Sequence, residues 1–166
     1  MGYSGGGADR AAARTRTQVG SVNAAFGARG IQLMSGAMKA YDPLKPTDPE
    51  EWLSTGEQER LDLVQSFHQR ARIRSPNAKV HAVMHVIVEN QIALGDELPV
   101  KGTVQRLMSD GLDRHDALHA VGSVLAGHLC DLLAAPAAGT GEDPNHPYYA
   151  ALEQLTAKDW LSSGDP

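Results

Sequence analysis

Two pairs of histidines at helical spacing constrain the fold of this chain more than any other feature. His81 and His85 stand four residues apart, and so do His115 and His119, and these pairs hold four of the seven histidines. Glu89 continues the first pair by four more residues. Side chains at this spacing lie above one another on one face of an α-helix. Imidazoles and a carboxylate on neighbouring turns are ligands for transition metals, so the spacing predicts helices that carry a metal site.

Apolar periodicity predicts an all-α fold. A segment near residues 78–94 is apolar almost all round, which is typical of a buried, central helix. The helix before it has Ser54-x-x-Glu57 at its start, a capping-box signature, and no segment has the period of a strand. The helices are expected at about 54–72, 78–94, 99–111, 113–134 and 148–161. This pattern predicts a bundle of four to five helices.

The first residues differ from the rest in composition. Residues 1–30 are rich in Gly, Ala, Ser and Thr, and prolines interrupt the segment that follows. Such composition supplies too little apolar surface to form a packed element. We therefore expect residues 1–46 to be a flexible N-terminal arm, mobile or loosely docked, and residues 47–162 to form a single helical metal-binding domain.

Charge and cysteine content narrow the class of protein. The net charge is −5 and the Lys and Arg residues are scattered, so nucleic acid is not an expected partner. No uninterrupted apolar run approaches the roughly 18 residues of a membrane span, so no membrane partner is expected either. Cys130 is the only cysteine, which fits a reducing cytoplasm. We expect a cytoplasmic protein whose partner is a small-molecule substrate or dioxygen; a homodimer is left open.

The metal ligands are predicted from helical phase. One histidine on an apolar face is usually a hydrogen-bonded core residue, but several that project to one interior favour a metal. His68 joins the set because it lies on the apolar stripe of the first long helix. Glu89 has an alternative role, as the partner of Arg114 or of a histidine N–H group. The predicted ligand set is His68, His81, His85, Glu89, His115 and His119.

Two further residues are candidates for catalysis. His115-Asp116-x-x-His119 is similar to His-Glu-x-x-His, in which two histidines hold zinc and the acid is a general base. Asp116 also stands three residues after the expected N-cap Asp113, and we favour that capping role. Arg114 could hold an anionic substrate or form a surface ion pair.

The same residues resemble two known families. The match to an uncharacterised bacterial family, domain-of-unknown-function family 1841, covers roughly residues 50–134. That family has Glu where this chain has Asp116; the resemblance implies the fold and the site but brings no activity. The ligand order is also similar to hemerythrin, which implies a di-iron centre in a four-helix bundle, although the loop lengths differ and a final His-x4-Asp is missing. The first resemblance rests on His81-x3-His85-Val-Ile-Val-Glu89-Asn90-Gln91 and on Gly111-Leu-Asp-Arg114-His115-Asp116-Ala-Leu-His119.

These patterns favour a non-haem metalloprotein with a mononuclear or dinuclear site of one or two iron ions. Its chemistry would be that of an iron-dependent oxidoreductase or oxygenase. The alternative is a zinc-dependent hydrolase that uses the His115-Asp116-x-x-His119 motif. A third interpretation is a non-enzymatic structural or sensing domain whose fold is stabilised by bound zinc or another transition metal.

Overall fold

The computed structural model describes residues 38–134 and 143–164, so most of the predicted arm, residues 1–37, lies outside the described part. Within these ranges the chain is helical and has no strand, which confirms the all-α fold. The first predicted helix begins at Glu57 and not at Ser54, which ends a separate short helix, and an extended pair of residues divides the last predicted helix in two. The α-helices are α1 Pro49–Ser54, α2 Glu57–Ala71, α3 Ala78–Ala93, α4 Val100–Ser109, α5 Arg114–Ala134, α6 His146–Gln154 and α7 Ala157–Ser163; a 3-10 turn, Gly95–Glu97, precedes α4.

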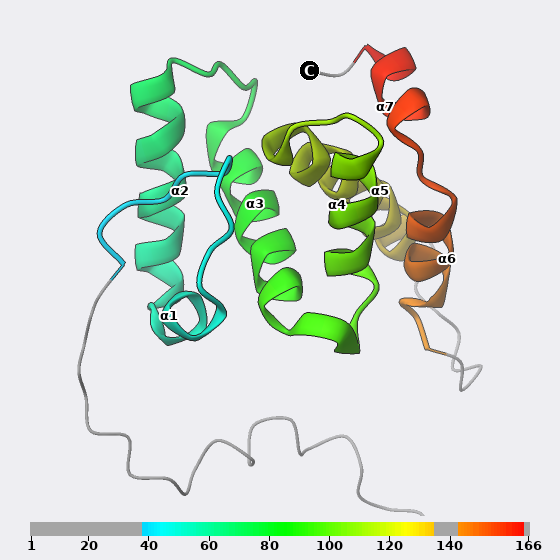
Figure 1. The fold of residues 1–166 in the computed structure, drawn as a ribbon, viewed down its shortest axis with the longest axis horizontal. Coiled ribbons are helices and arrows are strands. Elements are labelled where there is room, and N and C mark those ends of the chain that lie inside the picture. Colours follow the sequence, from blue (N-terminus) through cyan, green and yellow to red (C-terminus); the bar gives the residue numbers. More distant parts are fainter. Residues whose placement is uncertain (1–37, 135–142, 165–166) are drawn as a thin grey trace, which may run out of the picture. The chain divides into compact units, whose positions relative to one another are not determined.

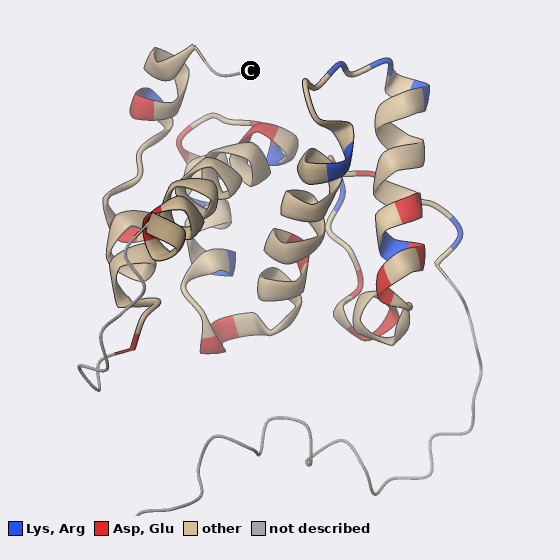
Figure 2. Cartoon of the chain, turned by 180° about the vertical axis from the view of Figure 1, so that it is seen from behind, with Lys and Arg blue, Asp and Glu red and all other residues tan. Residues whose placement is uncertain are grey.

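The helices α3 and α5 are the centre of the bundle. Helix α3 packs against α1, α2, α4 and α5, as its apolar composition predicts, and α5 packs against α3, α4, α6 and α7 (Figure 1). Figure 2 shows that charged residues are sparse on both. Four of the predicted ligand histidines belong to these two helices.

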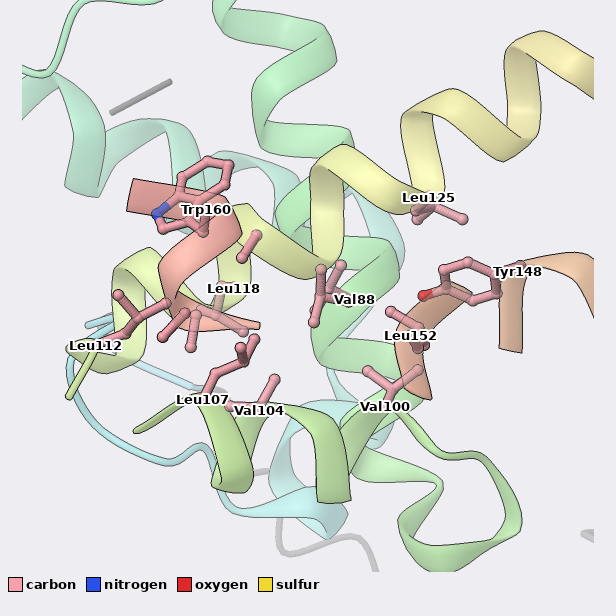
Figure 3. Close-up of a cluster of buried hydrophobic side chains, with 14 residues drawn as sticks. Val88, Val100, Val104, Leu107, Leu112, Leu118, Leu125, Tyr148, Leu152 and Trp160 are labelled. Carbon is pink, nitrogen blue, oxygen red and sulfur yellow. The ribbon is translucent and has the colours of Figure 1, made fainter. Parts of the chain in front are cut away.

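Two groups of apolar side chains hold the bundle together. Burial of each Val or Leu side chain contributes about 1.5–3 kcal/mol. The smaller group, around α1 to α3, includes Trp52, Val64 and Val86. The larger group, which is drawn in Figure 3, contains Val88, Val100, Val104, Leu107, Leu112, Ala117, Leu118, Ala120, Val121, Leu125, Tyr148, Leu152, Ala157 and Trp160.

The segment 38–46 packs onto the helices, although its prolines place it in the predicted arm. Met38 and Tyr41 belong to the smaller apolar group, and Tyr41 is only 2% exposed. The centroid of the Tyr41 ring lies 5.7 Å from the centroid of the Trp52 ring and 6.2 Å from that of the Phe67 ring. These contacts make residues 38–46 part of the helical unit.

Helix starts follow the expected chemistry at two places and depart from it at one. Asp48 caps α1 by accepting from the Glu51 N–H at 2.9 Å, and Asp113 Oδ1 accepts from the Asp116 N–H at 2.8 Å. The capping box predicted at Ser54 does not form. Ser54 ends α1 instead, and its hydroxyl donates to the Glu51 carbonyl.

Two amides on α3 join the helices around it. Asn90 Oδ1 accepts from the indole N–H of Trp52 at 2.8 Å and also from Arg60. Gln91 Oε1 accepts from the Tyr148 hydroxyl at 2.9 Å. Both amides therefore stabilise packing between helices.

Among the described residues, α5 is the one helix long and apolar enough to cross a membrane by length and composition. Ionisable residues in its first turns interrupt the apolar stretch of the sequence. A search for an uninterrupted apolar run therefore does not detect this helix. A central bundle helix has the same composition, and α5 is packed against α3 and α4. The absence of a membrane partner and the cytoplasmic location stay predictions.

Candidate metal centre

Five imidazoles from three helices meet inside the bundle. They come from α2, α3 and α5, and one ring nitrogen of each lies within 4.8 Å of the corresponding nitrogen of every other. Five of the six predicted ligands are thus brought together. They are His68, His81, His85, His115 and His119.

Hydrogen bonds define which nitrogen of two of these rings is free. His68 Nδ1 lies 2.8 Å from the Val64 carbonyl, which can only accept, so Nδ1 carries the proton and Nε2 has the lone pair. The Tyr41 hydroxyl donates to Glu89 at 2.9 Å and lies 3.2 Å from His85 Nδ1. Because its own proton points to Glu89, the hydroxyl accepts from Nδ1–H, which leaves the His85 Nε2 lone pair free.

The free nitrogens lie at the separation of two ligands on one ion. The distance from Nε2 to Nε2 is 3.0 Å for His68 and His81, and also 3.0 Å for His85 and His119. A metal–nitrogen distance of about 2.0–2.1 Å with angles near 90–110° places two nitrogens about 2.9–3.4 Å apart. One proton shared within each pair would also give this distance, but such sharing would not provide a partner for His115. The buried His115 Nε2 has no hydrogen-bond partner among the described residues.

Burial holds the imidazoles in the neutral form that binds metals. Together with the charge of the neighbouring imidazoles, it lowers the pKa of His115 to about 4 and that of His119 to about 3. Burial is also the main reason why the pKa values of His68, His81 and His85 lie below the usual 6.5, with the strongest effect on His85. At neutral pH the cluster therefore presents uncharged donors.

Glu89 does not join the cluster, contrary to the ligand role predicted from its spacing. Its oxygens accept from Tyr41 at 2.9 Å, from Thr47 at 3.3 Å and from two nitrogens of Arg114 at 2.8 Å. A carboxylate with four donors has little free basicity for a metal. The alternative role predicted for it, as the partner of Arg114, is the one that the contacts support.

Arg114 lies inside the bundle, where it is 5% exposed, so its ion pair is buried and not on the surface. Besides Glu89 it binds the Pro43 carbonyl at 2.9 Å. These contacts occupy the guanidinium group and leave it badly placed to hold a substrate.

Tyr41 is the site residue that sequence reasoning missed. It connects His85 to Glu89, and burial, followed by the charge of Glu89, raises its pKa well above the usual 10.0. Ligand histidines commonly donate their second N–H to such a partner, which fixes the ring. No periodic pattern pointed to Tyr41, because it stands in a proline-rich segment.

Asp116 and a further histidine of α5, His128, lie apart from the cluster. Asp116 is half-buried in the first turn of α5, and burial together with Asp113 raises its pKa. His128 is buried and stacks on Tyr148, with ring centroids 5.6 Å apart. Neither contributes to the group of converging nitrogens.

A pocket of about 170 Å³ reaches three of the histidines. Neither Asp116 nor Arg114 lines it, and none of its lining residues is an acid, a lysine or an arginine. A Cβ atom at Gly122 would meet nothing within 4 Å. The lining residues are His81, Met84, His85, Leu118, His119, Gly122, Ser123 and Trp160.

No family model matches the chain, and no curated protein or solved structure matches it. The resemblances to family 1841 and to hemerythrin therefore stay predictions. What the helical fold and the histidine cluster define is an all-α protein with a site suited to a metal.

Proposed function

We propose that this chain is a non-haem metalloprotein that holds one iron ion and carries out oxidoreductase chemistry on dioxygen or a small molecule. The observation that carries the proposal is the convergence of five imidazole nitrogens within 4.8 Å. Unpaired polar groups are costly inside a protein, and one ion satisfies all five at once.

The spacing of the donors supports one ion more than two. Opposite ligands on a single ion are about 4.0–4.2 Å apart, twice the usual metal–nitrogen distance. Two ions about 3.5–4 Å apart would spread their outer ligands to about 5–8 Å. In addition, the carboxylate best placed to bridge two ions, Glu89, is held by Arg114.

The number of donors supports iron over zinc. Zinc sites in proteins almost always have four ligands, and catalytic ones keep about three from the protein. Five imidazoles suit an ion that accepts five or six ligands, and imidazole is a common ligand of iron. Iron, when bound, would supply one-electron chemistry at the remaining position.

The lining of the pocket supports redox chemistry over hydrolysis. A zinc hydrolase needs a general base close to the reacting water. Asp116 does not line the pocket, and Glu89 is held by Arg114. The hydrolase alternative therefore lacks a base in the right place.

A structural or sensing domain is the second candidate. The observation that favours it is that three helices, α2, α3 and α5, supply the ligands. An ion bound there would join them whether or not it reacts. Turnover of dioxygen by the reduced, iron-loaded protein separates the two candidates.

The test is the metal content of protein purified from iron-supplemented cells. We expect about one iron per chain, loss of iron in His85→Ala and His119→Ala, and dioxygen uptake after reduction. His128→Ala is the matched control, since His128 is a buried histidine of the same helix as His119. One zinc in a colourless protein would favour the hydrolase or structural candidates. Folded protein without stoichiometric metal would overturn the proposal.

A further inference from the structure

We infer that the metal centre takes up a small anion from the pocket, on the side where His81, His85 and His119 line it. This inference rests on the proposed function and names the class of ligand that the same site would bind. It follows from the charge of the donors, the size of the pocket and the position of Gly122.

The first step is the charge balance of the site. All five donors are imidazoles, so they do not reduce the charge of a bound cation. The nearest buried carboxylate, Glu89, is neutralised by Arg114 through two hydrogen bonds of 2.8 Å. A buried charge is unfavourable unless another charge compensates it. The described residues around the site supply no such negative charge, so the compensating ligand must come from solution.

The acids at the start of α5 do not change this balance. The charge of Asp113 acts on His115 and His119, but Asp113 is exposed and caps the helix through the Asp116 N–H, so water screens this charge. Asp116 is half-buried, but it neither lines the pocket nor belongs to the converging group. Neither acid therefore offers a carboxylate oxygen as a ligand on the pocket side.

The second step is the size and lining of the pocket. Its volume of about 170 Å³ is below the roughly 300–1,000 Å³ of sites for drug-sized ligands. Met84, Leu118 and Trp160 make its wall largely apolar. Among the lining residues the one hydroxyl, on Ser123, donates to the Ala120 carbonyl at 2.8 Å. Without a lysine or an arginine, the pocket suits a monoanion of a few atoms that the ion itself attracts, and not a phosphate ester.

The third step is the free space in the pocket beside Gly122. Gly122 lines the pocket, and a Cβ atom there would meet nothing within 4 Å. A larger side chain can therefore enter the pocket without displacing the helix. Gly127 lies five residues later on α5, is exposed, and also has free space around a Cβ atom. The two glycines provide a matched pair of substitutions, one inside the pocket and one outside it.

The experiment is a titration of the oxidised, iron-loaded protein with sodium azide, followed by its charge-transfer absorption. We expect saturable binding to the unsubstituted protein and to Gly127→Leu. Gly122→Leu is expected to keep its iron but to bind azide at least tenfold more weakly.

The outcomes separate this inference from the proposal beneath it. Protein that binds no iron overturns the proposed function, and the inference with it. Iron-loaded protein that shows no response to azide overturns the inference alone. Equal azide binding by Gly122→Leu and Gly127→Leu shows that the anion does not enter through this pocket and overturns the inference as well.

Discussion

Arg114 and Glu89 form a bidentate ion pair inside the bundle, with both terminal nitrogens of the guanidinium 2.8 Å from a carboxylate oxygen. Glu89 is fully buried, and Arg114 also binds the Pro43 carbonyl. The pair therefore connects α3, α5 and the segment 38–46. Because Tyr41 belongs to that segment and contacts His85, the pair also positions a partner of the metal cluster.

Removal of one member of this pair is expected to destabilise the protein strongly. Arg114→Met leaves the Glu89 charge buried without a partner, which typically costs about 3–5 kcal/mol of unfolding free energy. Urea denaturation of the metal-free protein measures this change.

Two controls accompany that measurement. Arg114→Met combined with Glu89→Leu should recover most of the loss, since the unpaired charge is gone. Lys101→Met removes the exposed pair with Asp96 and should change the stability by less than about 1 kcal/mol. An Arg114→Met variant as stable as the unsubstituted protein would contradict the structural role of the pair.

The hydroxyl of Tyr41 is expected to strengthen metal binding through His85. Tyr41→Phe keeps the ring packed against Trp52 and Phe67 but removes the acceptor for His85 Nδ1–H. Loss of such a partner typically lowers metal affinity about 10–100-fold. Competition with a chelator of known affinity measures the change, and Tyr149→Phe, outside the site, is the control. Equal affinities of the two variants would show that the hydroxyl does not act on the ligand.

Helical phase explains why the histidines could be predicted and Glu89 could not. Histidines four residues apart must share a face, and the apolar stripe of α2 turns His68 toward the same interior. The same spacing placed Glu89 in the ligand set, since phase gives the direction of a side chain but not its partner. Its partners come from residues 25 and 48 positions away, Arg114 and Tyr41. Contacts of that range depend on the packing of the whole bundle.

The pocket could not be predicted from the sequence, for a related reason. A single sequence does not show whether a glycine such as Gly122 marks a close helix contact or free space. The outcome depends on where Trp160 and α7 pack, because they form part of the pocket wall. The same dependence applies to the ends of the last helix, which divides into α6 and α7.

Metal removal is expected to loosen α2 more than the other helices. In the described residues α2 packs mainly on α3, and its His68 is the group that connects it to the ligands of α5. Ligand binding stabilises the folded state, by about 4 kcal/mol when the free ligand is a thousandfold above its dissociation constant. Hydrogen exchange should therefore slow in α2 when metal is added and stay unchanged in α6. In His68→Ala the effect on α2 should disappear; its persistence would place the ion elsewhere.

The metal-free protein is expected to lose stability as the pH falls below about 6.5. The pKa of His115 is lowered to about 4 and that of His119 to about 3 by burial in the folded state, whereas the usual value is 6.5. Between these values the unfolded chain binds protons that the folded chain does not, so acid favours unfolding. Each such histidine contributes at most about 1.4 kcal/mol per pH unit, and partial exposure to solvent reduces this slope. Below about pH 4 the contribution of His115 stops growing.

Urea midpoints of the chelator-treated protein at pH 7, 6 and 5 test this dependence. The midpoint should fall with pH in the unsubstituted protein and fall less in a His115→Gln, His119→Gln double variant, whose amides do not titrate. His146→Gln is the control, because His146 is exposed at the start of α6 and outside the cluster. Parallel curves for all three proteins would mean that folding does not lower the pKa values of His115 and His119, which would contradict the effect of their burial.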